Sequence, residues 1–303
     1  MPQQWRKLGL LFEPDGTQEW MKTHASVPFA IHLKDDEFRI LVSGRDAGGR
    51  SHTGWFDAEI GDAPKVLAVS SEPLLSPGPP GSFDADGAMV SWVAQSGGSD
   101  FYYYIGWNRG TDVPFRNALG VALSCGVGDA VVKRPGPIID RSIHDPCFTA
   151  SACVIPGEDK WRMWYLSCVA WETRGGVPTA RYHIKYAESR DGISWVRNGV
   201  AAIDFADQTE SAISRPSVVR EHDLWRMWYS HRGDMYAIGY AESADGIVWN
   251  RMDDMAGIHA SSEGWDSEMI EYPHVFAHRG KLFMLYNGNE FGRSGVGLAV
   301  LEK

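Results

Sequence analysis

The chain has 303 residues, of which 44% are hydrophobic and 22% are charged, and it contains no apolar run close to the roughly 20 residues that a membrane span needs. This composition excludes a disordered chain, a coiled coil and an integral membrane protein. The 39 acidic and 29 basic residues give a net charge of −10, which excludes a general nucleic-acid binder and disfavours binding to anionic lipid.

The four cysteines are Cys125, Cys147, Cys153 and Cys168, and their spacing contains no CxxC pair. A zinc ribbon or a thioredoxin-type site is therefore not expected. The first residues, MPQQWRKLGLLF, show neither the apolar stretch nor the cleavage signal of a secretory peptide. We expect a cytoplasmic protein with reduced thiols.

Short alternating apolar segments recur along the chain and favour β-strands. Copies of one such strand start 56 to 64 residues apart. In chain order they are FRILVSGR (38–45), FYYYIGWN (101–108), WRMWYLS (161–167), WRMWYSH (225–231) and KLFMLYNGN (281–289).

A second strand and a tight turn follow the two most similar copies. The strands IKYAES (184–189) and IGYAES (238–243) lead into SRDGISW (189–195) and SADGIVW (243–249). Asp-Gly suits a turn that needs a positive φ, and we expect the tryptophan that follows to pack back on its own sheet.

A further apolar strand precedes each copy, so each repeat holds about four strands. The preceding strands are SVPFAIHL (26–33), GAMVSWVA (87–94), TASACVI (149–155), SRPSVVRE (214–221) and EYPHVFAH (271–278). Five four-stranded antiparallel units predict an all-β, five-bladed β-propeller that spans 1–303 as one domain. The N-terminal WRKLGLLFEP would supply the outer strand of the last blade and close the ring.

The W-x-M-W-Y strand, the Y-A-E-S-x-D-G-x-x-W hairpin and the count of five resemble the five-bladed propellers of glycoside hydrolase families 43, 32 and 68 and the mannoside phosphorylases of family 130. Segments such as GWDSEMIEYPHVF and YNGNEFGRSGVGLA are also similar to those of bacterial glycosyl-hydrolase-like proteins. The resemblance covers essentially the whole chain and implies the fold more strongly than it implies an activity.

Acidic residues lie at four of the five points where an innermost strand begins, close to the axis of a propeller. Glycoside hydrolysis needs two carboxyl groups with separated pKa values, one as acid and one as base or nucleophile. The alternative is that these residues are turn and cap residues. The catalytic candidates are Glu268 as acid and Asp145 as base, with Asp84, Asp86 and Glu210 as further members.

The first of these strand openings departs from the family pattern. Families 43 and 32 carry an acidic base or nucleophile there, whereas this chain has His24 in THASVPFA. This difference puts a standard family-43 catalytic triad in doubt.

Polar and aromatic residues at neighbouring strand ends are the candidate ligand-binding groups. Arginines there, including Arg293, would grip a phosphate, a uronate or a nucleotide-sugar diphosphate, or would only neutralise the chain's own carboxylates. The tryptophans would stack on a sugar ring or pack between blades. The candidates are His24, Arg45, Asp46, Trp107, Asn108, Arg116, Trp171, Arg215, Arg232, Glu271, Tyr272 and Asn289.

We therefore expect a glycosyl-hydrolase-like enzyme that acts on a carbohydrate or an anionic sugar. The alternatives are a biosynthetic propeller enzyme that acts on a nucleotide-linked sugar or another small anionic metabolite, and a non-catalytic sugar-binding propeller. The resemblance allows a central calcium, but no metal-ligand motif supports it, and no cofactor, nucleic-acid partner or membrane partner is expected.

Overall fold

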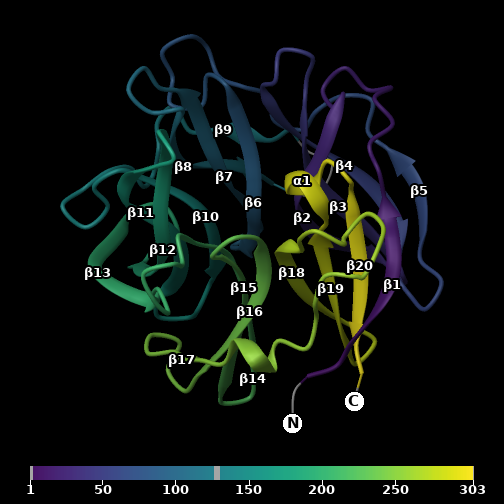
Figure 1. The fold of residues 1–303 in the computed structure, drawn as a ribbon. Helices are drawn as coiled ribbons and strands as arrows, with labels where there is room; N and C mark the ends of the chain where they lie inside the picture. Colours follow the sequence, from purple (N-terminus) through teal and green to yellow (C-terminus); the bar gives the residue numbers. More distant parts are fainter. Residues whose placement is uncertain (1–2, 126–129, 303) are drawn as a thin grey trace. The chain divides into compact units, whose positions relative to one another are not determined.

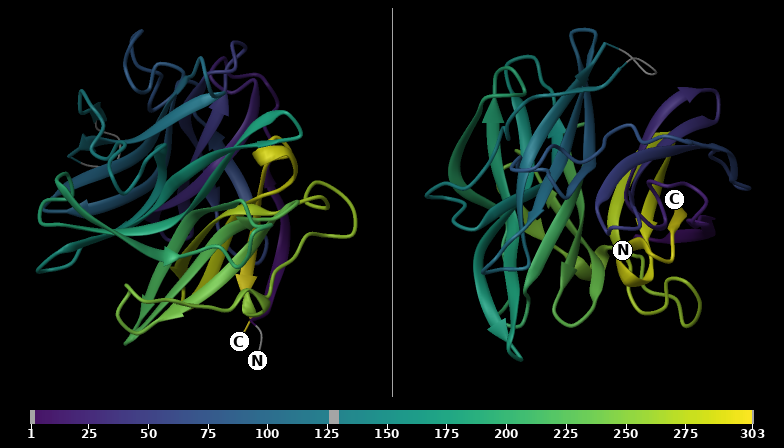
Figure 2. Two further views of the ribbon diagram at one scale, coloured as in Figure 1. Left: turned by 60° about the vertical axis from the view of Figure 1, so that its left-hand side comes forward. Right: turned by 90° about the horizontal axis from the view of Figure 1, so that it is seen from above.

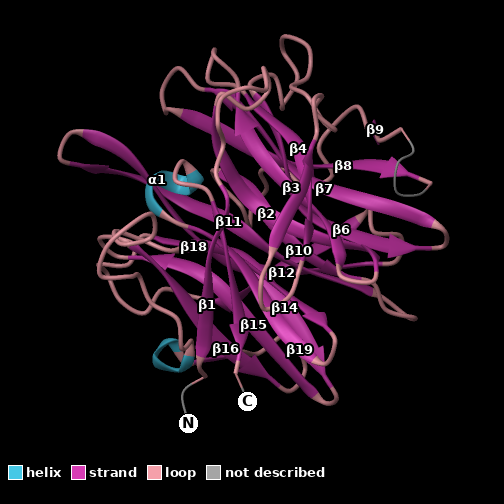
Figure 3. Ribbon diagram, turned by 90° about the vertical axis from the view of Figure 1, so that its right-hand side faces the viewer, coloured by secondary structure: helices cyan, strands magenta, loops and turns pink. Residues whose placement is uncertain are grey.

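The computed structural model describes residues 3–125 and 130–302, and nearly all of their regular secondary structure is β-strand (Figure 3). Within these residues the helices are only a 3₁₀ turn at Asp253–Met255 and the four-residue α1, Asn289–Gly292. No helix there is long and apolar enough to cross a membrane. The prediction of an all-β chain is confirmed.

The chain divides into two compact units. The first unit contains Met1–Leu74 and Ser217–Lys303, and the second contains Leu75–Pro216. The prediction of a single domain over 1–303 concerns the two units together and stays a prediction.

One sheet of the first unit is an antiparallel meander in which each strand pairs with the next (Figure 1). Its register places Thr23 opposite Arg45 and Phe38 opposite Ala58. The strands are β2 (Thr23–Lys34), β3 (Glu37–Arg45), β4 (Ser51–Glu59) and β5 (Lys65–Val69).

Another sheet of the first unit joins the two ends of the chain. The N-terminal strand β1 (Trp5–Phe12) pairs antiparallel with β20 (Val296–Leu301), so that purple β1 runs along yellow β20 in Figures 1 and 2. The order continues through β19 (Lys281–Asn287) to β18 (Glu271–His278). The N-terminal segment is thus an edge strand of the C-terminal sheet.

The WRMWYSH segment lies in a third set of strands. Its strand β15 pairs with β16, with Trp225 opposite Ser243 and Trp228 opposite Tyr240. The strands are β14 (Ala212–Glu221), which crosses the boundary between the units, β15 (Leu224–Arg232), β16 (Tyr236–Ser243) and β17 (Asn250–Arg251).

The second unit contains two further antiparallel meanders. The first consists of β6 (Gly87–Ser96), β7 (Ser99–Arg109), β8 (Phe115–Ser124) and β9 (Val132–Lys133). The second consists of β10 (Phe148–Ile155), β11 (Trp161–Arg174), β12 (Val177–Ser189) and β13 (Trp195–Ile203).

The Asp-Gly turns have the predicted geometry. Gly192 has a φ of 72° and Gly246 a φ of 76°. Asp191 accepts the backbone N–H groups of the two residues after Gly192, at 2.8 and 2.7 Å, and these bonds hold the pKa of its carboxyl at about 2. The Trp195 indole N–H donates back to the Gly192 carbonyl at 3.2 Å. The tryptophan therefore closes its own turn.

Serines connect the first strands of successive meanders. In the second unit, Ser91 accepts the N–H of Ala152 at 3.1 Å, and Ser151 accepts the N–H of Arg215 at 3.2 Å. In the first unit, a serine of β14 accepts the N–H of a β18 residue at 2.8 Å. The Ser91 bond satisfies a backbone donor beside the register shift between Ala150 and Ala152, which would otherwise leave it unpaired.

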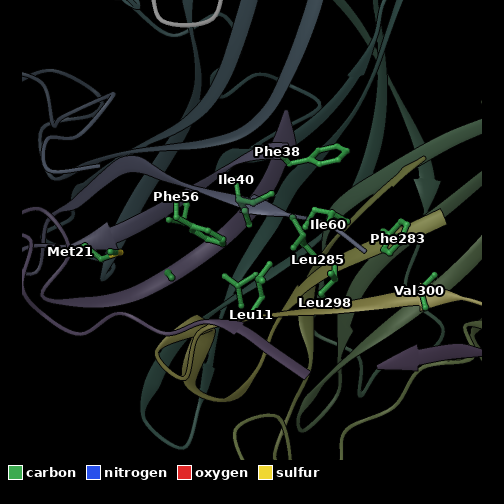
Figure 4. Packing of buried hydrophobic residues seen from close by; sticks show 14 of the residues in the cluster. Leu11, Met21, Phe38, Ile40, Phe56, Ile60, Phe283, Leu285, Leu298 and Val300 are labelled. Carbon is green, nitrogen blue, oxygen red and sulfur yellow. The ribbon is translucent and has the colours of Figure 1, made fainter. Parts of the chain in front are cut away.

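Each unit has its own apolar core. In the first unit, side chains of β1, β3, β4, β19 and β20 interlock, as Figure 4 shows for Leu11, Phe38, Phe56, Leu285 and Val300. In the second unit, Phe148 and Leu166 belong to the buried centre of a cluster with partly buried aromatic rings. Buried apolar surface stabilises a fold by roughly 25 cal/mol per Å², so these two cores help to hold the sheets in register.

Candidate functional site

Three sheets are preceded by a buried aspartate that accepts a hydrogen bond from a tyrosine 20 residues later in the chain. A lysine or an arginine pairs with each of these aspartates. Burial raises the pKa of each tyrosine, so its hydroxyl stays protonated and donates. The pairs are Asp84 with Tyr104, Asp145 with Tyr165, and Asp266 with Tyr286.

Asp145, predicted as the base, is completely buried in the second unit. One carboxylate oxygen accepts from Arg197 at 2.7 Å and from Ser142 at 3.0 Å. The other accepts from Tyr165 at 3.1 Å and lies 3.9 Å from the Lys185 ammonium. Both oxygens are occupied by groups of the protein, which is the environment of a structural ion pair.

Asp84 is held in the same way in the second unit. Its carboxylate accepts from Lys133 at 2.7 Å and from Ser82 at 2.7 Å. The half-buried Asp86 accepts the backbone N–H of Arg109 at 2.8 Å. These two catalytic candidates therefore anchor the start of β6.

Glu210 and Arg215 lie around the start of β14. Glu210 is buried and accepts the backbone N–H of Ala206 at 2.8 Å. The side chain of Arg215 is fully buried, which lowers its pKa to about 10 and leaves it charged at neutral pH. Arg215 is thus enclosed within the protein.

Trp171 and Trp107, the candidate sugar-stacking residues, pack on their own unit. The Trp171 ring centroid lies 5.3 Å from that of Phe115 and 5.8 Å from that of Phe148, within an aromatic cluster. Trp107 covers Gly87, where an added Cβ would meet its indole nitrogen at 1.9 Å. Both rings remain half-buried, so each keeps an accessible part.

The remaining polar candidates of the second unit make local contacts. Arg116 is exposed and pairs with Asp112 at 2.7 Å. Asn108 donates to the carbonyl of Ser82 at 3.4 Å. An exposed pair of this kind contributes about 0–1 kcal/mol to stability.

Glu271, at the first position of β18, is the most strongly perturbed carboxyl group of the first unit. Its side chain is completely buried, and this burial raises its pKa well above the usual range. The positive charge of Arg232 and the neighbouring Tyr272 favour the ionised form but do not outweigh burial. Burial therefore favours the protonated form of Glu271.

A group of aromatic rings lies beside Arg232 in the first unit. The Arg232 guanidinium lies 4.8 Å from the Tyr236 ring centroid. The Tyr236 ring lies 6.3 Å from that of Tyr272 and 6.0 Å from that of Phe291. Tyr272 is half-buried and Phe291 is 40% exposed, so this group reaches the surface.

Phe291 lies in a segment with an unusual backbone. Glu290 and Phe291 have φ values of 55° and 60°, and Gly292 follows with 85°. Left-handed backbone costs a non-glycine residue about 1–2 kcal/mol, so tertiary contacts must hold it. The Ser26 hydroxyl supplies one by donating to the Phe291 carbonyl at 2.5 Å. Such strain is frequent at binding and catalytic sites.

Three first strands also contain a left-handed residue before a proline, with φ between 50° and 56°. The proline removes a backbone donor, and two of these strands show a register shift at that point. A bulge of this kind changes the direction in which neighbouring side chains point. The dipeptides are Val27–Pro28 and Tyr272–Pro273 in the first unit and Arg215–Pro216 in the second.

Asn287 holds this part of the first unit together. It lies opposite Glu271 in the β18–β19 pairing and is completely buried. Its amide oxygen accepts the Val27 N–H at 2.9 Å, and its amide nitrogen donates to the carbonyls of Ala25 and Gly295, both at 2.8 Å. One side chain thus ties β2 to β19 and to the segment before β20.

His24 lies on β2 beside two arginines. Burial, together with the positive charges of Arg45 and Arg293, lowers its pKa to about 4, against the opposing charge of Glu290. Its Nδ1 lies 2.8 Å from the Thr23 hydroxyl oxygen. The imidazole is therefore neutral at physiological pH and lies within a positive local field.

Glu268, the predicted acid, is exposed. Its backbone N–H donates to the Asn289 side chain at 2.8 Å, so Asn289 ties this loop to α1.

Asp46 accepts four hydrogen bonds from Gly48, Arg50 and His52. Burial raises the pKa of Asp46, but these bonds and the Arg50 charge outweigh burial and lower this pKa to about 2. Asp46 therefore shapes the turn after β3.

The first unit thus brings together the predicted binding residues Glu271, Tyr272 and Arg232. The sequence reasoning missed Asn287 as a scaffold and Glu290 and Phe291 as neighbours of the site. Their signal is the run NGNEFGRSG, which is rich in glycine and asparagine and contains one aromatic residue between polar ones.

Within residues 3–125 and 130–302, no group of three or more His, Cys, Asp or Glu side chains is arranged to hold a metal ion. The histidines near the site make other contacts. His231 Nδ1 lies 3.4 Å from an Arg251 nitrogen, and the buried His274 ring lies tilted against that of Phe29, with 4.2 Å between the ring centroids.

The architecture matches solved structures over almost the whole chain. A glycosyl hydrolase from Bacteroides ovatus superposes with a TM-score of 0.74 at 15% identity, covering 99% of this chain and 94% of that one. Another structure, named simply a glycoside hydrolase, gives 0.74 at 17% identity, with 99% and 92% covered. A thermostable family-43 glycoside hydrolase gives 0.62 at 13% identity, with 96% and 92% covered.

The fold is therefore that of the glycoside-hydrolase-like propeller proteins. The sequence matches no protein-family model. It is 40% identical over 298 residues to the uncharacterized protein Rv1502 of Mycobacterium tuberculosis strain H37Rv and to the uncharacterized protein MT1551 of strain CDC 1551. The alignment covers 98% of this chain and 99% of each relative, so the chain belongs to the family of Rv1502 and MT1551.

Proposed function

We propose that the chain is a carbohydrate-active enzyme of the glycosyl-hydrolase type, which cleaves or transfers a glycosyl group by acid and base catalysis. The observation that carries this proposal is the buried carboxyl group of Glu271, whose pKa is raised beside Arg232 and a set of aromatic rings. A carboxyl group kept neutral by burial can donate a proton to a leaving oxygen. Such chemistry requires no cofactor.

Glu271 replaces Glu268 as the proposed acid. Tyr272, the next residue, is half-buried, so the chain passes here from the buried carboxyl group of Glu271 to the accessible face. Glu268, on the loop before β18, and Glu290, in α1, are exposed carboxylates, and they are the candidates for the second carboxyl group. Asp84 and Asp145 keep a structural role in this scheme.

The proposal includes the five-bladed ring. Its support is the strand pairing, in which successive strands form four-stranded meanders and the N-terminal β1 completes the sheet of β18, β19 and β20. The serine bonds between successive first strands also fit neighbouring blades. A ring places the first strands around an axis where a ligand can bind.

The names of similar structures agree with a carbohydrate substrate. One is a Bombyx mori GH32 beta-fructofuranosidase mutant in complex with sucrose, and another is a sucrose-6-phosphate hydrolase from Lactobacillus gasseri. At 13% and 14% identity, the likeness to these structures supports the fold alone. The carbohydrate substrate of this chain is our proposal.

The test is hydrolysis of a panel of nitrophenyl glycosides, neutral and anionic, by the full chain and by Glu271→Gln. Loss of the acid should reduce kcat about 100-fold or more. Glu13→Gln, at an exposed position, is the matched control and should retain full activity. Equal rates for Glu271→Gln and the unmodified protein would contradict the assigned acid. Binding of a sugar without any turnover would identify a non-catalytic sugar-binding protein instead.

A further inference from the structure

Arg45 is, among the described residues, a cation without an ion-pair partner of its own. It ends β3 opposite Thr23, and its carbonyl accepts the Lys22 N–H at 2.8 Å, which fixes the backbone. Its side chain is exposed, and within the described part of the chain no carboxylate lies within ion-pair distance. The adjacent Asp46 is already bound by Arg50 and His52.

Arg293, near the C-terminal end of the chain, is the second arginine beside His24. It follows α1, whose Phe291 carbonyl is bound to Ser26 of β2. Its one ion pair in the described part of the chain is with Glu290, three residues away at 3.1 Å, and both side chains are about 60% exposed. An exposed pair of this kind is weak, so a ligand can displace Glu290.

His24 contributes a hydrogen-bond donor beside Arg45 and Arg293. When the Thr23 hydroxyl donates to Nδ1, the ring proton lies on Nε2, so the neutral imidazole offers one N–H group. Arg45 lies opposite Thr23, the neighbour of His24, and Arg293 follows Phe291, whose carbonyl is bound to Ser26, so the backbone brings both arginines beside His24. The lowered pKa of His24 agrees with two positive charges there. An oxyanion would meet two guanidinium groups and one imidazole N–H.

We propose that Arg45, Arg293 and His24 form a subsite for a carboxylate or phosphate group carried by the sugar substrate. Arginine guanidinium groups match the planar, bidentate geometry of such oxyanions. The proposal rests on the proposed function in that the anion belongs to a sugar. It deepens that function by assigning the substrate to the acidic sugars: uronates or sugar phosphates.

The experiment is calorimetric titration of the full chain with four probes: glucose, glucuronate, glucose 6-phosphate and inorganic phosphate. One acidic sugar should bind at least about tenfold more tightly than glucose and more tightly than inorganic phosphate. Preference for glucuronate identifies a carboxylate subsite, and preference for glucose 6-phosphate identifies a phosphate subsite. Equal binding of glucose, or inorganic phosphate binding as tightly as the best sugar, would overturn the proposal.

Variants connect this binding to the named residues. Arg45→Gln and Arg293→Gln should each weaken binding of the preferred acidic sugar about tenfold, because a charged hydrogen bond is lost. Arg45→Lys, which keeps the charge but not the fork, should restore part of the affinity. Arg50→Gln is the matched control, since Arg50 is exposed and paired with Asp46. An unchanged Kd in Arg45→Gln, with an unchanged melting temperature, would overturn the proposal.

Glu271→Gln separates this inference from the proposed function. If no glycoside is cleaved but Glu271→Gln and the unmodified chain both bind the acidic sugar through Arg45, the enzyme proposal fails and the subsite stands. If glycosides are cleaved without preference for an acidic sugar, the subsite fails and the enzyme proposal stands.

Discussion

Replacing Asn287 by alanine tests the scaffold beneath the site. The substitution removes three hydrogen bonds of 2.8 to 2.9 Å from a completely buried side chain. It leaves the Val27 N–H and the carbonyls of Ala25 and Gly295 without this partner. An unmatched buried donor costs about 1–3 kcal/mol and each lost hydrogen bond about 1 kcal/mol, so we expect a loss of about 3–5 kcal/mol of unfolding free energy.

This loss is a large part of the roughly 5–15 kcal/mol that stabilises a typical domain. Urea unfolding followed by circular dichroism measures it as a lower midpoint at an unchanged slope. Asn289→Ala is the matched control. Asn289 also makes three hydrogen bonds, at 2.8, 3.3 and 3.2 Å, but it is only half-buried, so water can replace them. Its loss should be about 1 kcal/mol.

Equal losses for Asn287→Ala and Asn289→Ala would refute the reasoning, because burial would then make no difference. A near-neutral Asn287→Ala would show that β2 and the segment before β20 are held by other contacts.

Three further predictions concern single side chains. The pKa of Glu271 is raised in the native state, so its contribution to stability is complete below the unfolded pKa of about 4.3 and is lost as pH rises through the native pKa. The melting temperature of Glu271→Gln should therefore rise relative to that of the unmodified protein as pH increases. A constant difference between the two melting temperatures would contradict this. The pKa of His24 is lowered to about 4, so the stability that this group contributes above about pH 6.5 is lost as pH falls toward about 4. In His24→Gln the melting temperature should fall less over this pH range. An unchanged fall would show that another group titrates there. Trp228→Ala, at a fully buried position of β15, should cost about 3–5 kcal/mol in urea unfolding, and a neutral effect would contradict its place in the core.

The strands were predictable because their signals are local. The segments FRILVSGR and WRMWY lie in β3, β11 and β15, and the Asp-Gly turns form through bonds that span only three or four residues. The alternation of apolar residues and the residue types of the turns therefore predict this part of the fold.

The roles of the acidic residues depend on contacts that are distant in the sequence. Asp84 is neutralised by Lys133, 49 residues away, and Asp145 by Arg197, 52 residues away. No local pattern identifies such partners, so both carboxylates resemble catalytic candidates in the sequence.

The choice between Glu268 and Glu271 was beyond the sequence for a different reason. They lie three residues apart, and a bulge at Tyr272 and Pro273 accompanies the inward turn of Glu271, whereas Glu268 remains exposed. A left-handed tyrosine before a proline is unfavourable locally and persists only because the surrounding sheet holds it.

The most direct test of the account is the ionisation of Glu271 itself. Carbon-13 NMR of the full chain labelled at glutamate carboxyl carbons, with Glu271→Gln to assign the resonance, follows this ionisation as pH is raised. The account predicts one carboxyl group that titrates well above the usual glutamate range and whose resonance disappears in the variant. Titration of that resonance at the ordinary glutamate pKa of about 4.3 would contradict the assignment of Glu271 as the acid.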